Sequence, residues 1–381
     1  MLLSKSQGSR YSCEENMNVS MKSLVYSTIA GLALFLAPRP ANAQGCIVAR
    51  STVQPIGPES GGGYLRPGEF DFTLGYRHFY SHRHFVGDVE QKQRAQIGNQ
   101  FMNKVNLMNF NLTYQITPRF SAVASLPLQL ASRRQNNSPF TTTSQGIGDT
   151  TIGVQGWVFS PEKKTRGNIL IGVGVSMPSG RNDIKNNVDR LDGQGPQVTL
   201  LDYSIQPGSG GWGVAFSWQA FRALGNSFAV YTNGNYYAMP QNTVGFRRNT
   251  TTAINPLTLT AYTSIMDQYL MQGGIAKPLK NVRGLTLTAG LRMEGVPADD
   301  LFGDSLGFRR PGYSVAIEPG FQYSHANLGM LTFSVGKAIM RDRTRSVPDR
   351  ITGGHGDAAF ADYVWSASYS YRFGKPRGME H

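Results

Sequence analysis

The chain has 381 residues, a formal net charge of +13 and only 16% charged residues, and it is rich in Gly, Tyr and Phe. It contains no apolar run of the roughly 18 residues that a membrane-spanning helix needs. Its two cysteines, Cys13 and Cys46, exclude a disulfide-rich scaffold and a multi-cysteine metal site. The basic residues are scattered and form no recognisable nucleic-acid motif, so nucleic acid is not an expected partner.

The first 43 residues predict a leader that contains a secretory signal peptide. Lys22 precedes a mainly apolar run over residues 23–37, and the small residues Ala41 and Ala43 form a cleavage pattern. The run is too short to anchor the chain in a membrane. Two acidic residues precede this segment and do not suit a signal, so the true start is expected at Met17 or Met21. Residues 44–68, rich in Gly and Pro, are predicted to form an irregular periplasmic lead-in.

From residue 69 onward, apolar and polar residues alternate with a period of two. In the first run, Phe70, Phe72, Leu74 and Tyr76 share one face and polar or small residues share the other. Such alternation is typical of a β-strand with one apolar face. The same rhythm recurs to Phe373 and predicts twelve strands, although ten or fourteen stay open because boundaries drift. The connections are predicted at 81–104, 117–119, 131–148, 160–167, 179–210, 222–226, 239–266, 277–284, 297–311, 324–328 and 340–358.

These connections alternate between long and short, and the alternation indicates an architecture. Even-stranded transmembrane barrels have short periplasmic turns and long extracellular loops. Lipid offers no partner for backbone N–H and C=O groups, so strands can cross a membrane only as a closed sheet. We therefore predict an all-β fold: an antiparallel up-and-down β-barrel over residues 69–373, in a Gram-negative outer membrane. Both termini would be periplasmic, with residues 374–381 as a tail.

The last predicted strand carries aromatic side chains on one parity. Its polar face is mostly serine, and the opposite face holds Tyr363, Trp365, Tyr369, Tyr371 and Phe373. Tyr and Trp suit a lipid–water boundary. A near-terminal strand that ends in Phe resembles the insertion signal of bacterial outer-membrane barrels, although eight residues follow the Phe here. The resemblance implies the barrel-assembly machinery, outer-membrane lipid and lipopolysaccharide as partners, and a monomer is expected.

Short glycine motifs in the middle of the chain carry a second resemblance. Gly146-Ile147-Gly148-Asp149 enters one strand, Pro178-Ser179-Gly180 leaves the next, and Gly208-Ser209-Gly210-Gly211-Trp212 opens another. This layout resembles the outer-membrane family named for the MetA pathway of phenol degradation. The resemblance implies a barrel that passes small, often aromatic or hydrophobic compounds. It brings no assigned binding or catalytic residues and no cofactor.

Charged residues on the inward parity are the candidates for a functional site. Arg77, Arg292, Glu294 and Glu318 are predicted to face the lumen, and the neighbouring ninth and tenth strands would let Arg292 and Glu294 pair with Glu318. Such charges are costly against lipid and tolerated inside a barrel. They would either brace a narrow barrel or form a constriction that selects solutes. The predicted polar lining is completed by Gln115, Gln219, Asn233, Asn235, Gln268 and Gln272.

Three functions are consistent with these patterns. The favoured one is a passive channel for small solutes, partly occluded by loops such as 179–210. The second is a structural or surface-interaction barrel with a closed lumen. The third, an outer-membrane lipid hydrolase, needs a Ser beside a His near the outer rim, but Ser324-His325 falls at a predicted periplasmic turn. His78, His82 and His84 are expected in or beside a solvated loop rather than as metal ligands, so no catalytic residue and no metal is predicted.

Overall fold

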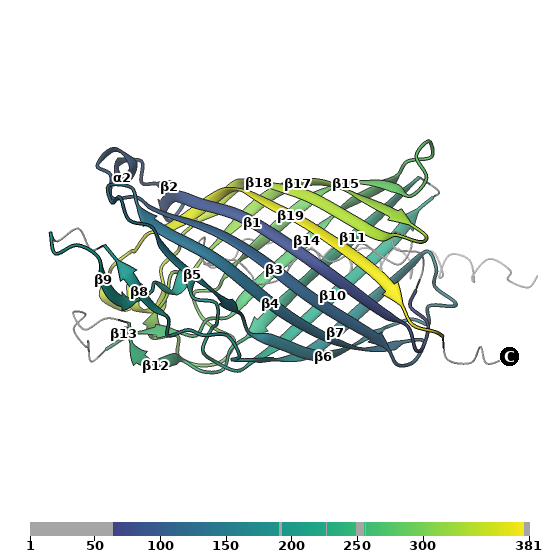
Figure 1. Cartoon of the computed structure of the whole chain (residues 1–381), viewed down its shortest axis with the longest axis horizontal. Coiled ribbons are helices and arrows are strands. Elements are labelled where there is room, and N and C mark those ends of the chain that lie inside the picture. Colours follow the sequence, from purple (N-terminus) through teal and green to yellow (C-terminus); the bar gives the residue numbers. More distant parts are fainter. Residues whose placement is uncertain (1–63, 190–192, 226, 249–254, 256, 377–381) are drawn as a thin grey trace, which may run out of the picture. The chain divides into compact units, whose positions relative to one another are not determined.

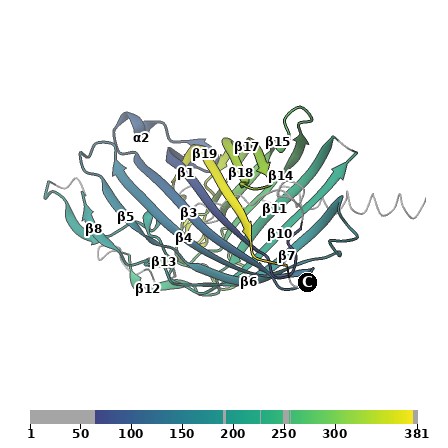
Figure 2. The same ribbon diagram turned by 45° about the vertical axis from the view of Figure 1, so that its right-hand side comes forward.

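The computed structural model describes residues 64–189, 193–225, 227–248, 255 and 257–376. The leader with its predicted signal peptide, most of the lead-in and the end of the tail lie outside these residues. Within them, twelve antiparallel strands form one sheet that closes on itself (Figures 1 and 2). They are β1 (Phe70–Val86), β3 (Phe101–Gln115), β4 (Phe120–Gln135), β6 (Thr150–Trp157), β7 (Gly167–Met177), β10 (Gly213–Leu224), β11 (Phe228–Ala238), β14 (Gln268–Pro278), β15 (Leu285–Val296), β17 (Gly312–His325), β18 (Gly329–Asp342) and β19 (Ala358–Phe373).

The barrel is closed by pairing between its first and last strands. β1 pairs antiparallel with β19 from Phe70 opposite Phe373 to Phe85 opposite Ala358, with two register shifts near Ser81. Each remaining strand pairs with its neighbours in chain order. Because the sheet has no free edge, the backbone groups of the wall are paired within it, which is the condition for strands to cross a membrane. The predicted strand number and closure are confirmed.

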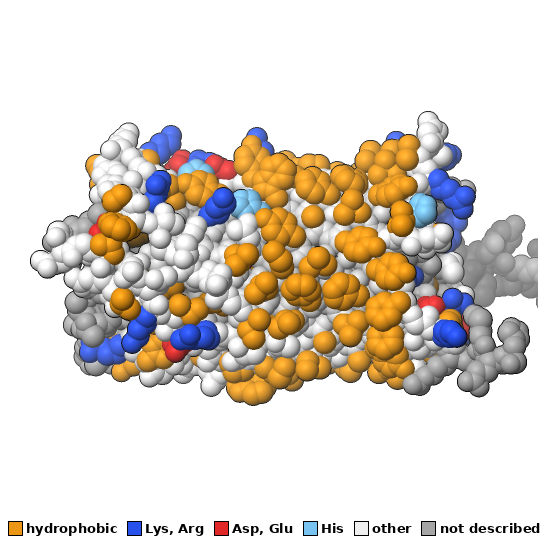
Figure 3. All heavy atoms as spheres, in the orientation of Figure 1, with side chains coloured by type: hydrophobic (Ala, Val, Ile, Leu, Met, Phe, Trp, Pro, Cys, Tyr) orange, Lys and Arg blue, Asp and Glu red, His pale blue; other side chains and the backbone are white. Residues whose placement is uncertain are grey.

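The outer surface of the wall is apolar over its middle and explains the period of two. Every barrel strand turns at least one large apolar side chain outward, and Figure 3 shows these side chains as a belt on the face in view. One from each strand is Leu74, Leu112, Leu126, Ile152, Ile171, Phe216, Val230, Met271, Leu291, Ile317, Leu331 and Trp365. An exposed apolar surface of this extent suits lipid rather than water.

The aromatic face of β19 lies on the outside of the barrel. Tyr363, Trp365, Tyr369, Tyr371 and Phe373 are 42–46% exposed. At the start of β1, the Phe70 ring stacks on the Phe373 ring with centroids 5.3 Å apart and contacts the Tyr114 ring at 4.6 Å. Aromatic rings thus gather on the outside at the end of the seam, which is the pairing between β1 and β19. Their role as an insertion signal stays a prediction.

The connections alternate in length as predicted. We call the end that carries the five short connections the short-turn end, and the end that carries the six long ones the long-loop end. Both ends of the described barrel segment, Glu69 and Gly374, lie at the short-turn end (Figure 1). Two short strands at the long-loop end extend the barrel sheet: β2 (Val89–Glu90) pairs with β1, and β5 (Thr142–Ile147) pairs with β4. The long loops also contain α2 (Gln93–Gln96), β8 (Lys185–Val188), β9 (Gln197–Leu200), η2 (Tyr203–Ile205), β12 (Thr243–Arg247), β13 (Leu259–Ser264), β16 (Gly307–Phe308) and α3 (Val347–Thr352).

Three strands run further toward the long-loop end than the sequence indicates. β1 continues to Val86, β3 begins at Phe101 and β4 ends at Gln135, so the predicted loops 81–104 and 131–148 are too long. Here the wall passes beyond the apolar belt and its outward residues no longer need to be apolar. The alternation therefore fades while the hydrogen-bonded ladder continues. No helix within the described ranges is long and apolar enough to cross a membrane, a finding that does not bear on strands.

Two of the three histidines of the first strand are placed differently from the prediction. His78 lies in β1 as expected, whereas His82 and His84 also lie in β1 rather than in a solvated loop. His84 is buried, with its Nδ1 atom 2.7 Å from an Asp357 carboxylate oxygen and its Nε2 atom 3.0 Å from the Phe101 amide nitrogen. It ties β1 to the start of β3 and β19, so its place is structural.

Candidate functional site

An ion-pair layer crosses the lumen near the middle of the barrel. Arg77 on β1 donates from its Nη2 to both carboxylate oxygens of Glu294 on β15, at 2.7 and 2.5 Å. β1 and β15 are not neighbours: β19, β18 and β17 lie between them in the sheet. The guanidinium therefore spans the lumen instead of lying along the wall. All four charged side chains of the layer are buried.

The same layer extends along the wall to Glu318. Arg292 donates from Nε to Glu294 at 3.1 Å and from Nη1 to Glu318 at 3.4 Å. Glu318 also accepts from Gln272 Nε2 at 2.7 Å and from the Ser334 hydroxyl at 2.6 Å. Two cations and two anions balance, and neutral donors satisfy the remaining carboxylate oxygens. Such balance is what allows charges to be buried at low cost.

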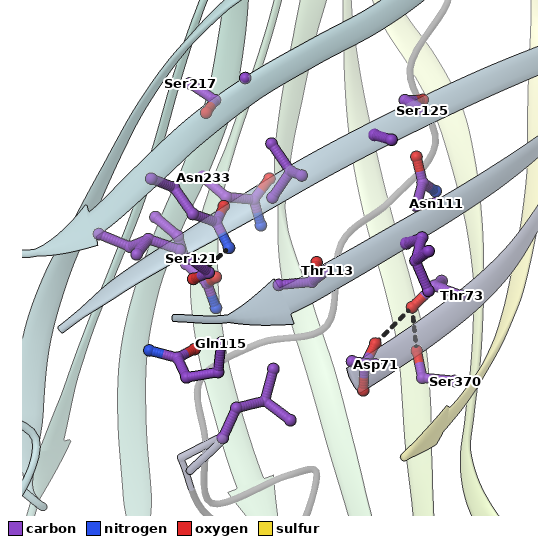
Figure 4. A pocket seen from close by; sticks show the side chains of 18 of the residues that line it. Asp71, Thr73, Asn111, Thr113, Gln115, Ser121, Ser125, Ser217, Asn233 and Ser370 are labelled. Atoms are coloured by element: carbon purple, nitrogen blue, oxygen red, sulfur yellow. Dashed lines mark hydrogen bonds between the residues drawn. The ribbon is translucent and has the colours of Figure 1, made fainter. Parts of the chain in front are cut away.

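On the short-turn side of this layer lies a polar vestibule. It is a cavity of about 790 Å³ that extends from the turn at Ser324 and His325 to Leu270 in mid-barrel. Hydroxyl and amide groups line much of its wall beside apolar side chains such as Leu170 and Leu270, and Figure 4 shows Asn111, Thr113, Gln115, Ser121 and Asn233 among the polar ones. The Thr73 hydroxyl lies 3.0 Å from an Asp71 carboxylate oxygen and 2.6 Å from the Ser370 hydroxyl. These groups suit a water-filled compartment.

On the long-loop side of the layer, one part of the inner wall is apolar. Phe79, Val105, Ala131 and Val364, from four strands that are adjacent around the seam, form a patch that we call the apolar lumen patch. Leu201 and Ile205, from the loop between β7 and β10, pack on it and are themselves buried. The Ile205 carbonyl accepts a hydrogen bond from Gln129 Nε2 at 3.0 Å. The loop thus fills the lumen where the wall offers an apolar surface.

Ion pairs hold this loop in place. Asp202 is 3.5 Å from Arg133 on β4 and 2.7 Å from Arg310 in the loop between β15 and β17. Burial alone would raise the pKa of Asp202, but the two guanidinium groups hold that pKa well below its usual value of 3.8. Asp202 therefore stays ionised and fastens the loop to the wall on one side and to a second loop on the other.

Two further long loops are bonded to each other at the long-loop end. Asp267 is fully buried and accepts hydrogen bonds from the amides of Met239 and Leu301, at 2.6 and 2.8 Å. Arg309, also buried, pairs with Asp300 and donates to the Ser264 hydroxyl. These contacts join the loop 239–267 to the loop 297–311 at the long-loop end.

The glycine motifs of the sequence form the root of the loop that enters the lumen. Asp149 accepts from the amides of Gly180 and Ser209, at 3.1 and 2.7 Å, and so joins both ends of the loop to β6. A Cβ atom on Gly208 would lie 2.0 Å from the Gly180 carbonyl oxygen. Only glycine permits this approach of two backbones. The motifs are therefore explained by loop anchoring.

The structure places all ten predicted lumen residues on the inner face, in three groups. Arg77, Arg292, Glu294, Glu318 and Gln272 come together in the ion-pair layer. Gln115, Gln219, Asn233 and Asn235 line the vestibule, and Gln268 lies apart, at a cavity of about 30 Å³ beside Asp149. A role in selecting solutes stays a prediction. The sequence analysis missed the apolar lumen patch. Phe79 could have indicated it, because it is an apolar residue at a position of β1 that the alternation assigns to the polar inner face.

The candidates for other chemistry do not gather into a site. Ser324 and His325 lie at the short-turn end, where His325 Nδ1 is 3.4 Å from the Asn327 amide nitrogen. His355 lies near the long-loop end, where its Nε2 atom is 2.6 Å from the Arg343 carbonyl oxygen. Among the described residues, no group of three His, Cys, Asp or Glu could hold a metal ion.

Comparisons with known proteins give a structural likeness only. No family model matches the chain, and no curated protein matches it in sequence. An outer-membrane channel from Pseudomonas putida F1 matches with a TM-score of 0.54 at 14% identity, covering 84% of this chain and 100% of that chain. The β domain of the Bordetella autotransporter BrkA (12% identity; 81% and 100% covered) and a Pseudomonas aeruginosa FadL homologue (8% identity; 84% and 99% covered) both reach 0.41, too low to argue from. The chain shares the fold of the first of these barrels.

Proposed function

We propose that the protein is an outer-membrane channel that lets small solutes diffuse passively, and that it favours apolar or aromatic ones. The apolar belt and the closed sheet support a place in a membrane built from strands. Short turns on the side of both barrel ends support periplasmic termini. The solved barrel from Pseudomonas putida F1 that it resembles is named an outer-membrane channel, which is consistent with this assignment.

The observation that carries the solute class is the apolar lumen patch. A water-filled pore gains nothing from Phe79, Val105, Ala131 and Val364 on its inner wall. In the closed arrangement Leu201 and Ile205 occupy this patch and remove it from water. An apolar solute that enters from the long-loop side would compete with these two side chains for the same surface. The solute would then displace the loop and open its own path to the polar vestibule.

A closed structural barrel is the second candidate. It is favoured by the ion-pair layer, in which Arg77 crosses the lumen to Glu294. With the layer and the loop in place, two barriers stand in series between the long-loop end and the vestibule. The channel proposal therefore requires that both can open, whereas a structural barrel requires neither to do so.

Planar-bilayer conductance distinguishes the two candidates. We expect small, rare openings from the wild type and frequent ones from Leu201→Asn/Ile205→Asn, because polar side chains lose the apolar contact. Val198→Asn, in the same loop but 68% exposed, is the matched control and is expected to behave like the wild type. A small neutral aromatic such as benzyl alcohol should raise the open probability of the wild type and leave the double variant unchanged.

The outcomes separate the parts of the proposal. If neither the wild type nor the double variant conducts, the channel assignment fails and the closed barrel is favoured. If both conduct and benzyl alcohol has no effect on the wild type, the channel stands but the apolar solute class is wrong.

A further inference from the structure

Charge is distributed unequally between the two ends of the barrel. Among the described residues at the short-turn end, eleven are Lys or Arg and only three carry carboxylates. The basic ones are Arg66, Arg119, Lys163, Lys164, Arg166, Arg222, Lys277, Lys280, Arg283, Arg372 and Lys375, and the acidic ones are Glu69, Asp71 and Glu162. Two ion pairs form there, Arg66 with Glu69 and Arg372 with Asp71. At the long-loop end, by contrast, most basic residues are paired. Among the described residues, the other nine basic side chains at this end form no ion pair with a carboxylate.

Two of these cations lie on the outside of the wall, and a third lies in an adjacent short turn. Arg222 on β10 has the outward parity of the exposed Phe216 and Leu224. Lys277 on β14 has the outward parity of Met271 and Ile275, and its Nζ atom lies 5.3 Å from the Phe228 ring centroid.

Arg166, in the short turn before β7, completes the set. Its carbonyl accepts from the amide of Ala223, the residue next to Arg222, at 2.7 Å, and its guanidinium donates to the Gly225 carbonyl. β7, β10, β11 and β14 are consecutive in the sheet, so the three residues lie along one arc of the rim. We call them the outer cationic arc.

Apolar wall lies directly beside this arc. Val230 on β11 pairs with Arg222 on one side and with Ile275 on the other. Phe228, Val230 and Ile275 are exposed, and with Ile169 and Ile171 on β7 they continue the apolar belt. A ligand that contacts both surfaces must carry negative charge at one end and long apolar chains at the other.

We propose that the outer cationic arc binds the headgroup of an anionic phospholipid, with its acyl chains lying on the apolar wall of β10, β11 and β14. Long basic side chains at the edge of a membrane belt extend toward the headgroup level, where phosphate oxygens are found. Charge complementarity favours a lipid with more than one negative charge, such as cardiolipin. The placement in the inner leaflet rests on the proposed membrane orientation, but the binding surface itself does not. The carboxylates of the cell-wall peptidoglycan are the competing ligand for exposed cations at this end.

The test compares two triple variants of the full chain, purified in detergent. One removes the arc, Arg166→Gln/Arg222→Gln/Lys277→Gln. The other is a matched control that removes three exposed cations near the long-loop end, Lys92→Gln/Lys104→Gln/Arg134→Gln. Native mass spectrometry measures binding of cardiolipin and of phosphatidylcholine, and the faster gel migration of unheated barrel confirms that each protein is folded.

Each basic side chain near an anionic surface contributes about fivefold to binding, so the arc variant should bind cardiolipin on the order of 100-fold more weakly. The wild type and the control should bind it alike, and phosphatidylcholine should not discriminate among the three. Equal cardiolipin binding by both triple variants overturns the proposal. Sedimentation with purified peptidoglycan sacculi covers the competing ligand: if the arc variant loses sacculus binding and keeps cardiolipin binding, the arc serves the cell wall instead. None of these readouts depends on conductance, so failure here leaves the channel assignment standing.

Discussion

The folding free energy of the barrel should fall when the central carboxylate of the ion-pair layer is removed. Glu294 lies between two guanidinium groups and accepts from Arg77 at 2.7 and 2.5 Å and from Arg292 at 3.1 Å. In Glu294→Ala, two buried cations are left with one carboxylate, Glu318. Removal of one partner of a buried pair costs about 3–5 kcal/mol, since the remaining charge stays buried without compensation. The expected loss in folding free energy is therefore about 3–5 kcal/mol.

A second substitution in the same layer tests the reasoning. Arg77→Ala/Glu294→Ala restores neutrality and leaves the pair of Arg292 and Glu318 intact. Its cost should be smaller than the sum of the two single variants by about 1–3 kcal/mol. Urea unfolding of the barrel in lipid vesicles, followed by tryptophan fluorescence, measures each cost, with Asn111→Ala in the vestibule as a lumen control. If the costs of the single variants add within error, the cross-lumen pair is not energetically coupled and the layer does not brace the barrel. Both variants should also raise the conductance, because the layer crosses the lumen.

Three further predictions concern the loop, the belt and the loop root. Because the pKa of Asp202 is held well below 3.8, its ion pairs with the loop's neighbours are fully formed above pH 3.8 and are lost as the pH falls through the lowered pKa. The open probability in a planar bilayer should therefore rise in that acid range. Asp202→Asn should open readily at neutral pH and respond little to acid. Leu291→Arg on the apolar belt should destabilise the folded barrel by about 2–4 kcal/mol, measured by unfolding in vesicles. Val198→Arg, in an exposed loop, should be nearly neutral. Equal costs would contradict the placement of Leu291 on the lipid-facing side of β15. Gly208→Ala should lower the folding free energy by about 1–3 kcal/mol and speed proteolysis of the loop, because its Cβ would overlap the Gly180 carbonyl. The control is Gly354→Ala, where a Cβ would meet only ordinary contacts. Equal proteolysis of the two variants would refute the close approach.

The wall of the barrel was predictable because it follows a local rule. A strand between lipid and lumen must alternate, so Leu74 and Tyr76 point outward while Arg77 points inward, and these parities read directly from the sequence. Where the wall leaves the belt, this rule no longer applies. Residues 81–86 of β1 therefore looked like a loop although their ladder to β19 continues.

The contents of the lumen were harder to predict because they depend on the closure of the sheet. The pairing of Arg292 with Glu318 could be inferred from neighbouring strands. The partner of Arg77 could not, since Glu294 lies 217 residues away and faces it across the lumen. The seating of Leu201 and Ile205 on the apolar lumen patch likewise depends on where a long loop folds, and no local pattern in the loop encodes that position.

The ion pair between Arg77 and Glu294 also has a consequence for the order of assembly. β1 is the first strand to emerge and its partner β19 is the last, so the sheet can curl shut only when the whole chain is present. Until the sheet closes, nothing holds Glu294 of β15 opposite Arg77, and the first strand is an open edge. Contacts this distant in sequence slow the search for the native state. The ion pair of Arg77 thus forms late, when the barrel closes. A chain that stops before β19 would expose both an unpaired strand edge and an arginine without its carboxylate, two features that distinguish it from the complete barrel.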